Sequence, residues 1–301
     1  MRIFSPIATS VKFQDAKRLI RYFFIVMSVT LRYNRIMEAG LRTKKKRKRI
    51  RGFLCLASVI LSAGCSYSPT FSPGDIVSAV TIEETRRTIE IMPAGAVSTD
   101  TGLLFYPGGL VDNHVYNVLL ARFTEISGIP SVIVKMPANL AVFDIDAGLS
   151  VTPSFPDITR WIIAGHSLGG SMAASTVRSN PGAYEGLIFM DSYPSGADSL
   201  KNWPGTVLSL YSSVEKVNDE ERMQKTLDLI PPATWLTASE RVYPVETGNY
   251  AVIHQIDGGS HSFFGTYGPQ DGDITPTITR EAFHDEVIDY MVEFFDKNLW
   301  R

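Results

Sequence analysis

Residues 161–170, WIIAGHSLGG, decide the fold because they join an apolar strand to a helix through a serine between two glycines. The segment contains the pattern G-x-S-x-G with Ser167 at its centre, and small residues follow as far as about residue 179. A strand that runs through such a turn into a helix is typical of a nucleophile elbow, whose serine is strained and whose glycines let strand and helix approach closely. A glycine-rich turn with an inert serine is the alternative.

The rest of the chain alternates between short apolar runs and segments with helical spacing. We expect strands at residues 87–92, 102–106, 131–135, 160–164, 184–190, 206–211 and 251–256, and helices at residues 113–126, 167–179 and 278–298. This alternation predicts a single α/β domain over residues 81–301, with a mostly parallel sheet and helices on both faces. The connection at residues 191–205 leaves no room for a large cap domain, so we expect an open, shallow site.

Two of the expected helices carry apolar residues at the three- and four-residue spacing of one helix face. In the first helix these residues are Val115, Leu119, Phe123 and Ile126, and in the last they are Phe283, Val287, Met291 and Phe294. Both helices are therefore expected to be amphipathic.

Charge is distributed unevenly along the 301 residues, although the formal net charge is only −2. Residues 1–64 hold fifteen of the 29 Lys and Arg side chains but only two of the 31 acidic ones, Asp15 and Glu38. The remaining 237 residues therefore hold 14 basic and 29 acidic side chains, which gives a net charge of −15. Phosphates would repel such a domain, so nucleic-acid binding is not expected.

The basic residues belong to a predicted leader, residues 1–64. KKKRKRIR at residues 44–51 precedes a short apolar run, and LSAGC at residues 61–65 follows it. A positive segment, an apolar run too short to span a bilayer and a small-residue cleavage site together predict a secretory signal peptide. The ending is similar to a bacterial lipobox, so we expect Cys65 to be lipidated and to anchor the protein to the extracytoplasmic face of the cell membrane.

The leader can be interpreted in other ways, and two expectations follow for the chain after it. Cys65 could be incidental, which would leave a secreted protein, or the basic run could be a nuclear-localisation or nucleic-acid patch. A start at Met37 rather than Met1 would give the positive segment an ordinary length. Residues 65–80, rich in Ser and Pro, are expected to be a tether. With Cys55 removed and Cys65 lipidated, no free thiol remains for cysteine catalysis.

Backbone donors for an oxyanion are expected from two segments. The helix after Ser167 begins at Leu168, whose N–H points where negative charge would develop. FYPGGL at residues 105–110 follows an earlier strand, where a second donor belongs, and Gly108, Gly109 and Leu110 are the candidates. A plain tight turn is the alternative, because Pro-Gly-Gly suits many turns.

The general base is expected at His261, in DGGSH at residues 257–261, because it directly follows the last expected strand. The other candidates are interpreted as structural: His166 because it should point away from the site, His254 because it lies in a strand, and His284 because it lies on the last helix. The aromatic residues after His261 (Phe263, Phe264 and Tyr267) could line an apolar acyl site or pack in the core.

Two carboxylates compete for the acid that orients the base. Glu215 follows the strand at residues 206–211 and lies about midway in sequence between Ser167 and His261, so it is preferred. Asp191, which follows the preceding strand, is the alternative. Either carboxylate would fix the tautomer of the imidazole and stabilise the imidazolium.

With these motifs the sequence resembles the α/β-hydrolase superfamily and, within it, α/β-hydrolase family 5, a carboxylesterase-like group akin to dienelactone hydrolases. The matching segments are FYPGG at 105–109, VKMP at 134–137, GHSLGG at 165–170, GGSH at 258–261 and FGTYGPQ at 264–270. The resemblance implies serine hydrolase chemistry without a cofactor or metal. The group usually has Asp-Gly where this chain has Glu215-Lys216, and its counterpart of residues 236–247 is usually shorter.

The expected function is hydrolysis of a small-molecule carboxylic ester, in which Ser167 forms an acyl-enzyme, His261 is the base and Glu215 the acid. The same triad could serve an acyltransferase or a peptidase. A non-catalytic surface-binding protein could also use this fold.

Overall fold

The computed structural model describes residues 67–69, 79–95, 99–212, 226–236, 250–270 and 272–299. By their internal contacts, Met1–Cys65 and Ser66–Arg301 are two units, and every described residue belongs to the second. The predicted leader, the predicted lipidation site Cys65 and the preferred acid Glu215 therefore lie outside the described residues, and these predictions remain predictions.

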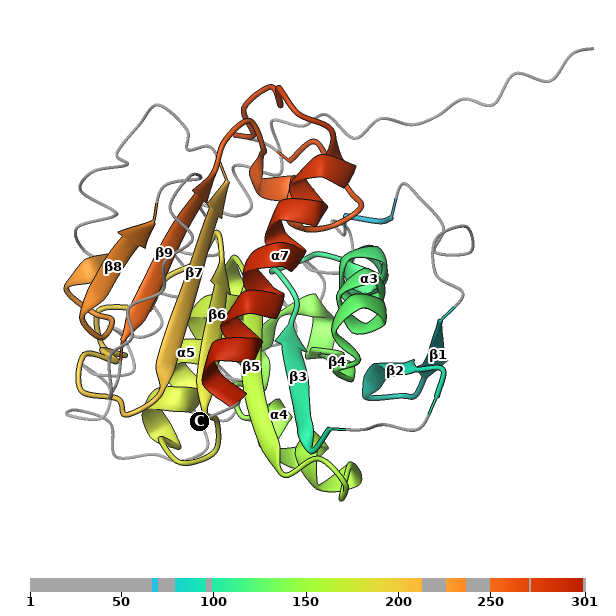
Figure 1. Ribbon diagram of the computed structural model, residues 1–301, viewed down its shortest axis with the longest axis vertical. Helices are drawn as coiled ribbons and strands as arrows, with labels where there is room; N and C mark the ends of the chain where they lie inside the picture. Colours follow the sequence, from blue (N-terminus) through green and yellow to red (C-terminus); the bar gives the residue numbers. More distant parts are fainter. Residues whose placement is uncertain are drawn as a thin grey trace, which may run out of the picture. The chain divides into compact units, whose positions relative to one another are not determined.

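Nine described strands form one sheet, in the order β1-β2-β4-β3-β5-β6-β7-β9-β8 (Figure 1). Strands β1 and β2 are antiparallel to their neighbours, and all pairs from β4 to β8 are parallel, which confirms the predicted mostly parallel sheet. The bounds are β1 Val80–Glu84, β2 Thr88–Pro93, β3 Thr101–Tyr106, β4 Ser131–Val134, β5 Arg160–His166, β6 Gly186–Met190, β7 Thr206–Ser212, β8 Ala233–Leu236 and β9 Ala251–Ile256.

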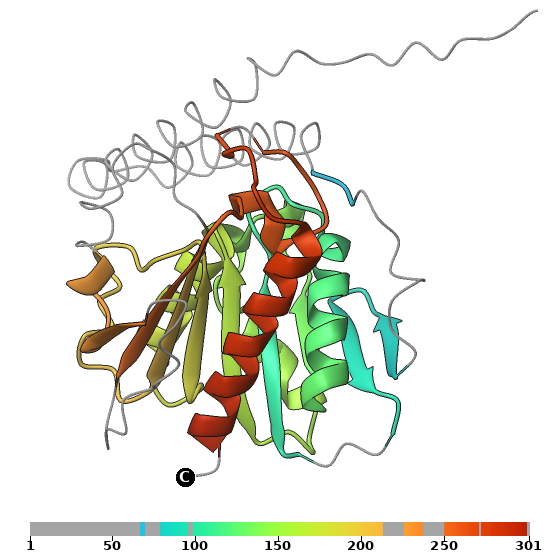
Figure 2. The same cartoon turned by 45° about the horizontal axis from the view of Figure 1, so that its top comes forward.

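Helices cover both faces of the sheet. Helices α3 and α7 pack on one face and α4 and α5 on the other (Figures 1 and 2). No described helix combines the length and hydropathy that a membrane crossing requires. The α-helices are α3 Asn117–Ser127, α4 Ala147–Val151, α5 Leu168–Ser179 and α7 Arg280–Leu299, and the 3-10 turns are η2 Asn113–Tyr116, η3 Pro137–Asn139, η4 Ala141–Phe143, η5 Thr152–Ser154 and η6 His261–Phe264.

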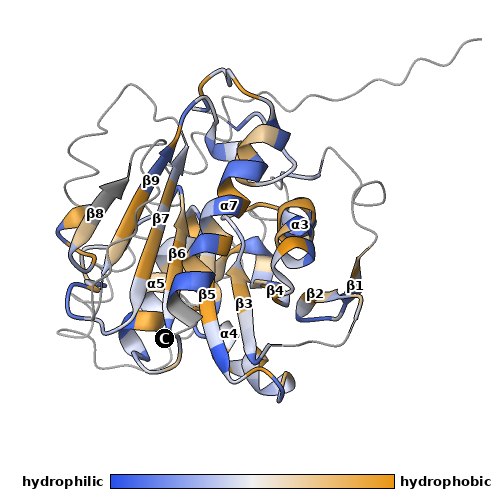
Figure 3. Cartoon of the chain, viewed as in Figure 1, coloured by the Kyte–Doolittle hydropathy of each residue, from blue (hydrophilic) through white to orange (hydrophobic). Residues whose placement is uncertain are grey.

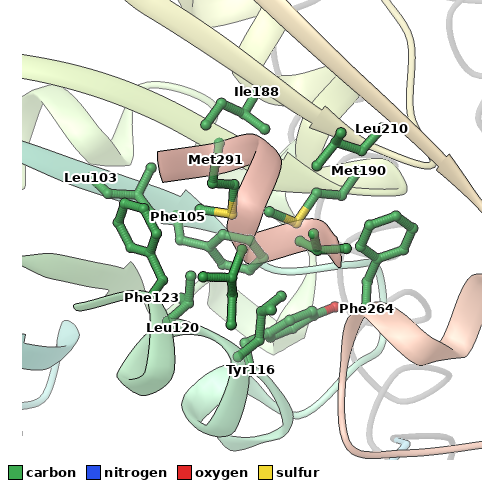
Figure 4. Close-up of a cluster of buried hydrophobic side chains, with 14 of the residues drawn as sticks. Leu103, Phe105, Tyr116, Leu120, Phe123, Ile188, Met190, Leu210, Phe264 and Met291 are labelled. Atoms are coloured by element: carbon green, nitrogen blue, oxygen red, sulfur yellow. The ribbon is translucent and has the colours of Figure 1, made fainter. Parts of the chain in front are cut away.

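The alternation of side chains along each strand divides the core into two clusters. On β3, Leu103 and Phe105 face the cluster under α3 and α7, whereas Leu104 and Tyr106 face the cluster under α4 and α5. Figure 3 shows mainly hydrophobic central strands, as expected for a sheet buried on both faces. Figure 4 shows the first cluster, in which Tyr116 and Phe264 lie together.

Most of the expected elements are present, but some details differ. The short strands β1 and β8 were not expected; β1 is largely exposed, so its sequence carries little apolar signal. Of the predicted apolar faces only Ile126 is out of place, 60% exposed in the last turn of α3. No helix or strand lies between β6 and β7, as expected for a domain without a cap.

Tyr67, inside the predicted tether, contacts the domain. It forms an isolated parallel bridge with Val111, in which its N–H donates to Leu110 O at 3.0 Å and its carbonyl accepts from Asp112 N–H at 2.9 Å. Its ring lies 5.4 Å from that of Tyr267, centroid to centroid. The chain therefore enters the described domain beside residues 110–112.

Candidate active site

Ser167 has the strained backbone expected of an elbow. It lies between β5 and α5 with φ 52° and ψ −123°, a conformation that a residue with a side chain rarely adopts. The two glycines explain how the turn closes. A Cβ on Gly169 would lie 2.2 Å from Tyr106 O, and one on Gly165 would lie 2.5 Å from Gly170 N. Only glycine at these two positions lets α5 pack this closely on β3 and β5.

Two hydrogen bonds tie the elbow to the end of the neighbouring strand. The Ser167 N–H donates to Met190 O at 3.0 Å, and the Ser192 hydroxyl donates to Ser167 O at 2.6 Å. Residue 191 lies between these two partners, so the turn at Ser167 and the end of β6 are held together.

His261 is paired with Asp191. The His261 ring Nδ1 lies 3.2 Å from Asp191 Oδ2. His261 begins η6 shortly after β9, and Asp191 directly follows β6 with φ 44°. The structure thus brings together the predicted base and the carboxylate that was the alternative acid, while the preferred Glu215 lies outside the described residues.

Three hydrogen-bond donors surround the Asp191 carboxylate. Besides His261, it accepts from the N–H of Ser212 at 2.8 Å and from the Ser212 hydroxyl at 2.5 Å. Burial alone would raise the pKa of Asp191, but the hydrogen bonds from His261 and Ser212 outweigh burial and lower it. Asp191 is therefore ionised at neutral pH and can hold a proton on His261 Nδ1.

The structure reduces the four predicted backbone donors to two. Gly108 N–H donates to the Tyr116 hydroxyl at 2.9 Å, and Leu110 N–H donates to Asn139 O at 2.8 Å, so both are used inside the protein. Within the described residues, Gly109 N–H and Leu168 N–H have no acceptor. These two residues are adjacent, because a Cβ on Gly109 would lie 3.3 Å from Leu168 Cβ. They form a pair of donors beside Ser167.

The position of His166 differs from the prediction. It is fully buried, as a structural residue should be, but it does not point away from the site: its ring lies against that of His261, with centroids 4.4 Å apart. Its Nδ1 lies 2.9 Å from the Tyr116 hydroxyl. Burial lowers the pKa of His166 well below its usual range, and the nearby His261 lowers it further, so the ring is neutral.

The remaining histidines of the predicted set are structural, as expected. His254 stacks on Tyr290 with ring centroids 3.7 Å apart, and His284 Nε2 donates to Phe263 O at 2.7 Å. Burial is the main reason that the pKa of His284 falls to about 4. Neither ring takes part in the His261–Asp191 pair.

Core packing accounts for two of the three aromatic residues after His261. Phe264 and Tyr267 are fully buried, whereas Phe263 is partly buried beneath the Arg280 guanidinium, 4.8 Å from its ring centroid. Only Phe263 remains a candidate for contact with an acyl group. The described residues contain no cluster of three or more His, Cys, Asp or Glu side chains that could hold a metal ion.

Sequence reasoning missed three polar residues that support the site. Tyr116 and Ser192 gave no signal, because each lies in a segment whose pattern concerns packing or turn formation. Ser212 could have been noticed, since it stands at the end of β7, close to where the acid was expected. Its hydroxyl serves an acid that comes from the neighbouring strand.

Comparison with known proteins agrees with this architecture. The model of the Alpha/beta hydrolase family matches residues 102–285. A search of curated proteins finds no relative. Among solved structures, carboxyl esterase 2 of the mycorrhizal fungus Tuber melanosporum is similar, with a TM-score of 0.50 and 11% identity, over 78% of this chain and 91% of that chain. At this identity the similarity shows the fold alone.

Two other solved structures match less closely in shape. One is the dienelactone hydrolase of Anabaena variabilis, with a TM-score of 0.49 and 13% identity, over 73% of this chain and 99% of that one. The other is the carboxylesterase EstE1, cloned from a metagenomic library, with a TM-score of 0.45 and 15% identity, over 71% and 90%. Since the family model covers more than half of the sequence and its match spans the elbow, Asp191 and His261, this chain belongs to the alpha/beta hydrolase family.

Proposed function

We propose that this protein is a serine hydrolase that cleaves a carboxylic ester of a small molecule. The observation that carries the proposal is the hydrogen bond between His261 and Asp191 at the sheet edge where Ser167 forms a strained elbow. A histidine held by an ionised carboxylate beside such a serine is the arrangement that activates a hydroxyl for attack on a carbonyl.

The first half of the reaction forms an acyl-enzyme. Asp191 keeps a proton on His261 Nδ1, which leaves Nε2 free to take the proton of the Ser167 hydroxyl as its oxygen bonds to the ester carbon. The carbonyl oxygen becomes an oxyanion that accepts from Gly109 N–H and Leu168 N–H. When the ester C–O bond breaks, the His261 imidazolium gives its proton to the departing alkoxide, and the alcohol leaves.

The second half uses the same groups. Water loses a proton to His261 and attacks the acyl carbon, and the oxyanion again accepts from Gly109 and Leu168. The carboxylic acid leaves as the proton returns to Ser167. We assign the acid to Asp191 rather than Glu215, because Asp191 makes the bond to His261 and its lowered pKa keeps it charged.

We further propose that the protein works at the extracytoplasmic face of a bacterial membrane, held by a lipid on Cys65. The sequence supports this through its basic run, its short apolar run and LSAGC at residues 61–65. The intact mass of the mature protein tests it, because lipidation at Cys65 adds acyl mass to residues 65–301. Release of Cys65→Ser from the membrane fraction is the matching expectation.

Removal of the nucleophile tests the catalytic proposal. Ser167→Ala should lower kcat on a short-chain aryl ester by about 10⁴-fold or more, since the members of such a triad act as a unit. A fluorophosphonate probe should label the wild type at Ser167 and leave Ser167→Ala unlabelled. Ser195→Ala, at an exposed serine on the loop after β6, is the matched control and should keep full activity. Full activity in Ser167→Ala would contradict the proposal.

A further inference from the structure

Two buried hydrogen bonds join the loop that carries Gly109 to the residue before Ser167. Gly108 N–H donates to the Tyr116 hydroxyl at 2.9 Å, and that hydroxyl lies 2.9 Å from His166 Nδ1. The side chains of Tyr116 and His166 are both fully buried. We propose that Tyr116 and His166 are positioning residues that set the geometry of the oxyanion hole; this inference rests on the proposed ester hydrolysis and deepens it.

The two hydrogen bonds of Tyr116 can both be oriented in the same direction. Gly108 N–H can only donate, so it occupies one lone pair of the Tyr116 oxygen, and we assign the tyrosine proton to the bond with His166 Nδ1. Burial and the nearby His261 keep His166 neutral, so Nδ1 is able to accept. Burial raises the pKa of Tyr116, so its hydroxyl stays protonated. The result is a series of two hydrogen bonds between neutral groups, from Gly108 through Tyr116 to His166.

The first bond decides which N–H of the loop can face the substrate. Gly108 turns its N–H inward to Tyr116, and Leu110 turns its N–H to Asn139 O. Gly109, between them, keeps its N–H for an oxyanion. Glycine at position 108 is part of the device, because a Cβ there would lie 2.9 Å from the Tyr116 oxygen and 3.0 Å from His166 Nδ1.

The second bond sets the separation of the two donors. Gly109 belongs to the loop after β3, and Leu168 belongs to the turn after β5. The β3–β5 strand pairing ends at Tyr106 and Gly165. Beyond it, the Tyr116 hydroxyl bonds to both sides: to the residue before Gly109 and to the ring of the residue before Ser167. An oxyanion hole works because its donors are fixed before charge develops, so a small displacement of one donor costs rate.

The neutral state of His166 also matters for the base. The His166 and His261 rings lie 4.4 Å apart between centroids. A cationic His166 would repel the imidazolium that His261 becomes during the reaction. The proton from Tyr116 occupies the Nδ1 lone pair and fixes the neutral ring with its own proton on Nε2. The same hydroxyl therefore aims the oxyanion loop and defines the tautomer of the ring next to the base.

Tyr116→Phe tests the inference by removing only the hydroxyl. The rate per active site, counted by fluorophosphonate titration, should fall about 10- to 100-fold in kcat, and KM should stay within about twofold, because the loss is felt only when the oxyanion forms. An aryl boronate, whose tetrahedral adduct places an oxygen in the oxyanion hole, should bind more weakly by the same factor. Tyr184→Phe, which removes a buried hydroxyl in the other core cluster, is the matched control and should change neither.

A pair of His166 variants supplies a second measurement. His166→Asn keeps an acceptor oxygen near the place of Nδ1 and should retain kcat within about threefold, whereas His166→Leu removes the acceptor and should behave like Tyr116→Phe. This pair also decides the matter if Tyr116→Phe does not fold. A merely structural role predicts a lower melting temperature with unchanged kcat and boronate affinity, and that result in the folded variants would overturn the inference.

The same assays separate this inference from the proposed function. Wild-type protein that hydrolyses no ester and takes up no probe at Ser167 would overturn both. Wild-type protein that hydrolyses esters, with Tyr116→Phe and His166→Leu as fast as the wild type, would overturn the positioning role alone.

Discussion

The two sides of the candidate site are held by different kinds of interaction. On the oxyanion side, neutral groups hold the loop after β3: Gly108 bonds to Tyr116 and Leu110 bonds to Asn139. On the acid side, the interactions centre on a charge, because Asp191 is ionised and accepts from Ser212 and His261. The acid side thus places a charge where the imidazolium forms, while the loop on the oxyanion side offers backbone dipoles fixed in advance.

The largest expected effect breaks the acid side. Asp191→Asn keeps the shape of the side chain but removes the charge and favours the wrong tautomer of His261, so kcat should fall about 10³- to 10⁴-fold. Steady-state kinetics on an aryl ester measure this. Glu215→Gln is the decisive companion variant and should stay near the wild-type rate. A large loss in Glu215→Gln together with an active Asp191→Asn would return the acid role to Glu215.

The next effect breaks the oxyanion side through its backbone. In Gly169→Ala the new Cβ would lie 2.2 Å from Tyr106 O and 2.4 Å from Pro107 O, both backbone atoms. Strand and helix must then separate, so the free energy of unfolding should fall by about 3 kcal/mol, at the upper end for an overpacked site. Urea denaturation measures the loss. Gly182→Ala, at a turn where a Cβ would meet nothing within 4 Å, should change stability by less than about 0.5 kcal/mol.

A third measurement concerns His284, the buried neutral histidine that donates to Phe263 O. The pKa of His284 falls to about 4 in the folded protein, below the usual 6.5, so the unfolded chain takes up the proton first as the pH falls. Stability from this group is therefore complete above pH 6.5 and is lost progressively toward pH 4, at about 1.4 kcal/mol per pH unit.

Urea denaturation between pH 6.5 and pH 5 should show this slope, a loss of about 2 kcal/mol from His284 alone, with a further loss from His166 in the same direction. His284→Gln removes the titrating ring and should flatten the profile by about that amount. An unchanged slope in His284→Gln would show that other groups set the acid limit.

The smallest expected effect comes from removing one of the donors to Asp191. Ser212→Ala removes one hydroxyl donor to Asp191 but leaves the backbone donor and His261, so kcat should fall about 3- to 10-fold. Ser209→Ala, on the same strand, is the matched control, because its buried hydroxyl has no partner among the described residues. Equal rates in the two variants would contradict a contribution of the Ser212 hydroxyl to catalysis.

Sequence predicted the parts of the molecule that depend on local pattern. The strands from β2 to β9 apart from β8, the elbow at Ser167 and the position of His261 after the last strand all follow from apolar runs, glycines and chain order. The choice between Asp191 and Glu215 did not, because both carboxylates follow a strand. Only the three-dimensional structure shows that the left-handed backbone at Asp191 aims its side chain at His261.

The position of the His166 ring could not be predicted for a similar reason. Alternation along β5 indicates which face of the sheet a side chain takes, but not which loops from other strands cover that face. His166 meets His261 and Tyr116 across sequence separations that no local pattern records. Buried polar contacts between distant segments are therefore the part of this site that required the fold.

The bridge at Tyr67 has a consequence for how the molecule would face a surface. Tyr67 pairs with Val111 and contacts Tyr267, so the polypeptide enters the domain beside the loop after β3 that carries the candidate oxyanion donor Gly109. In the lipid-anchored form proposed above, the lipid on Cys65 is only two residues upstream of Tyr67. So short a connection would keep this side of the domain close to the bilayer, where esters that partition into lipid are concentrated.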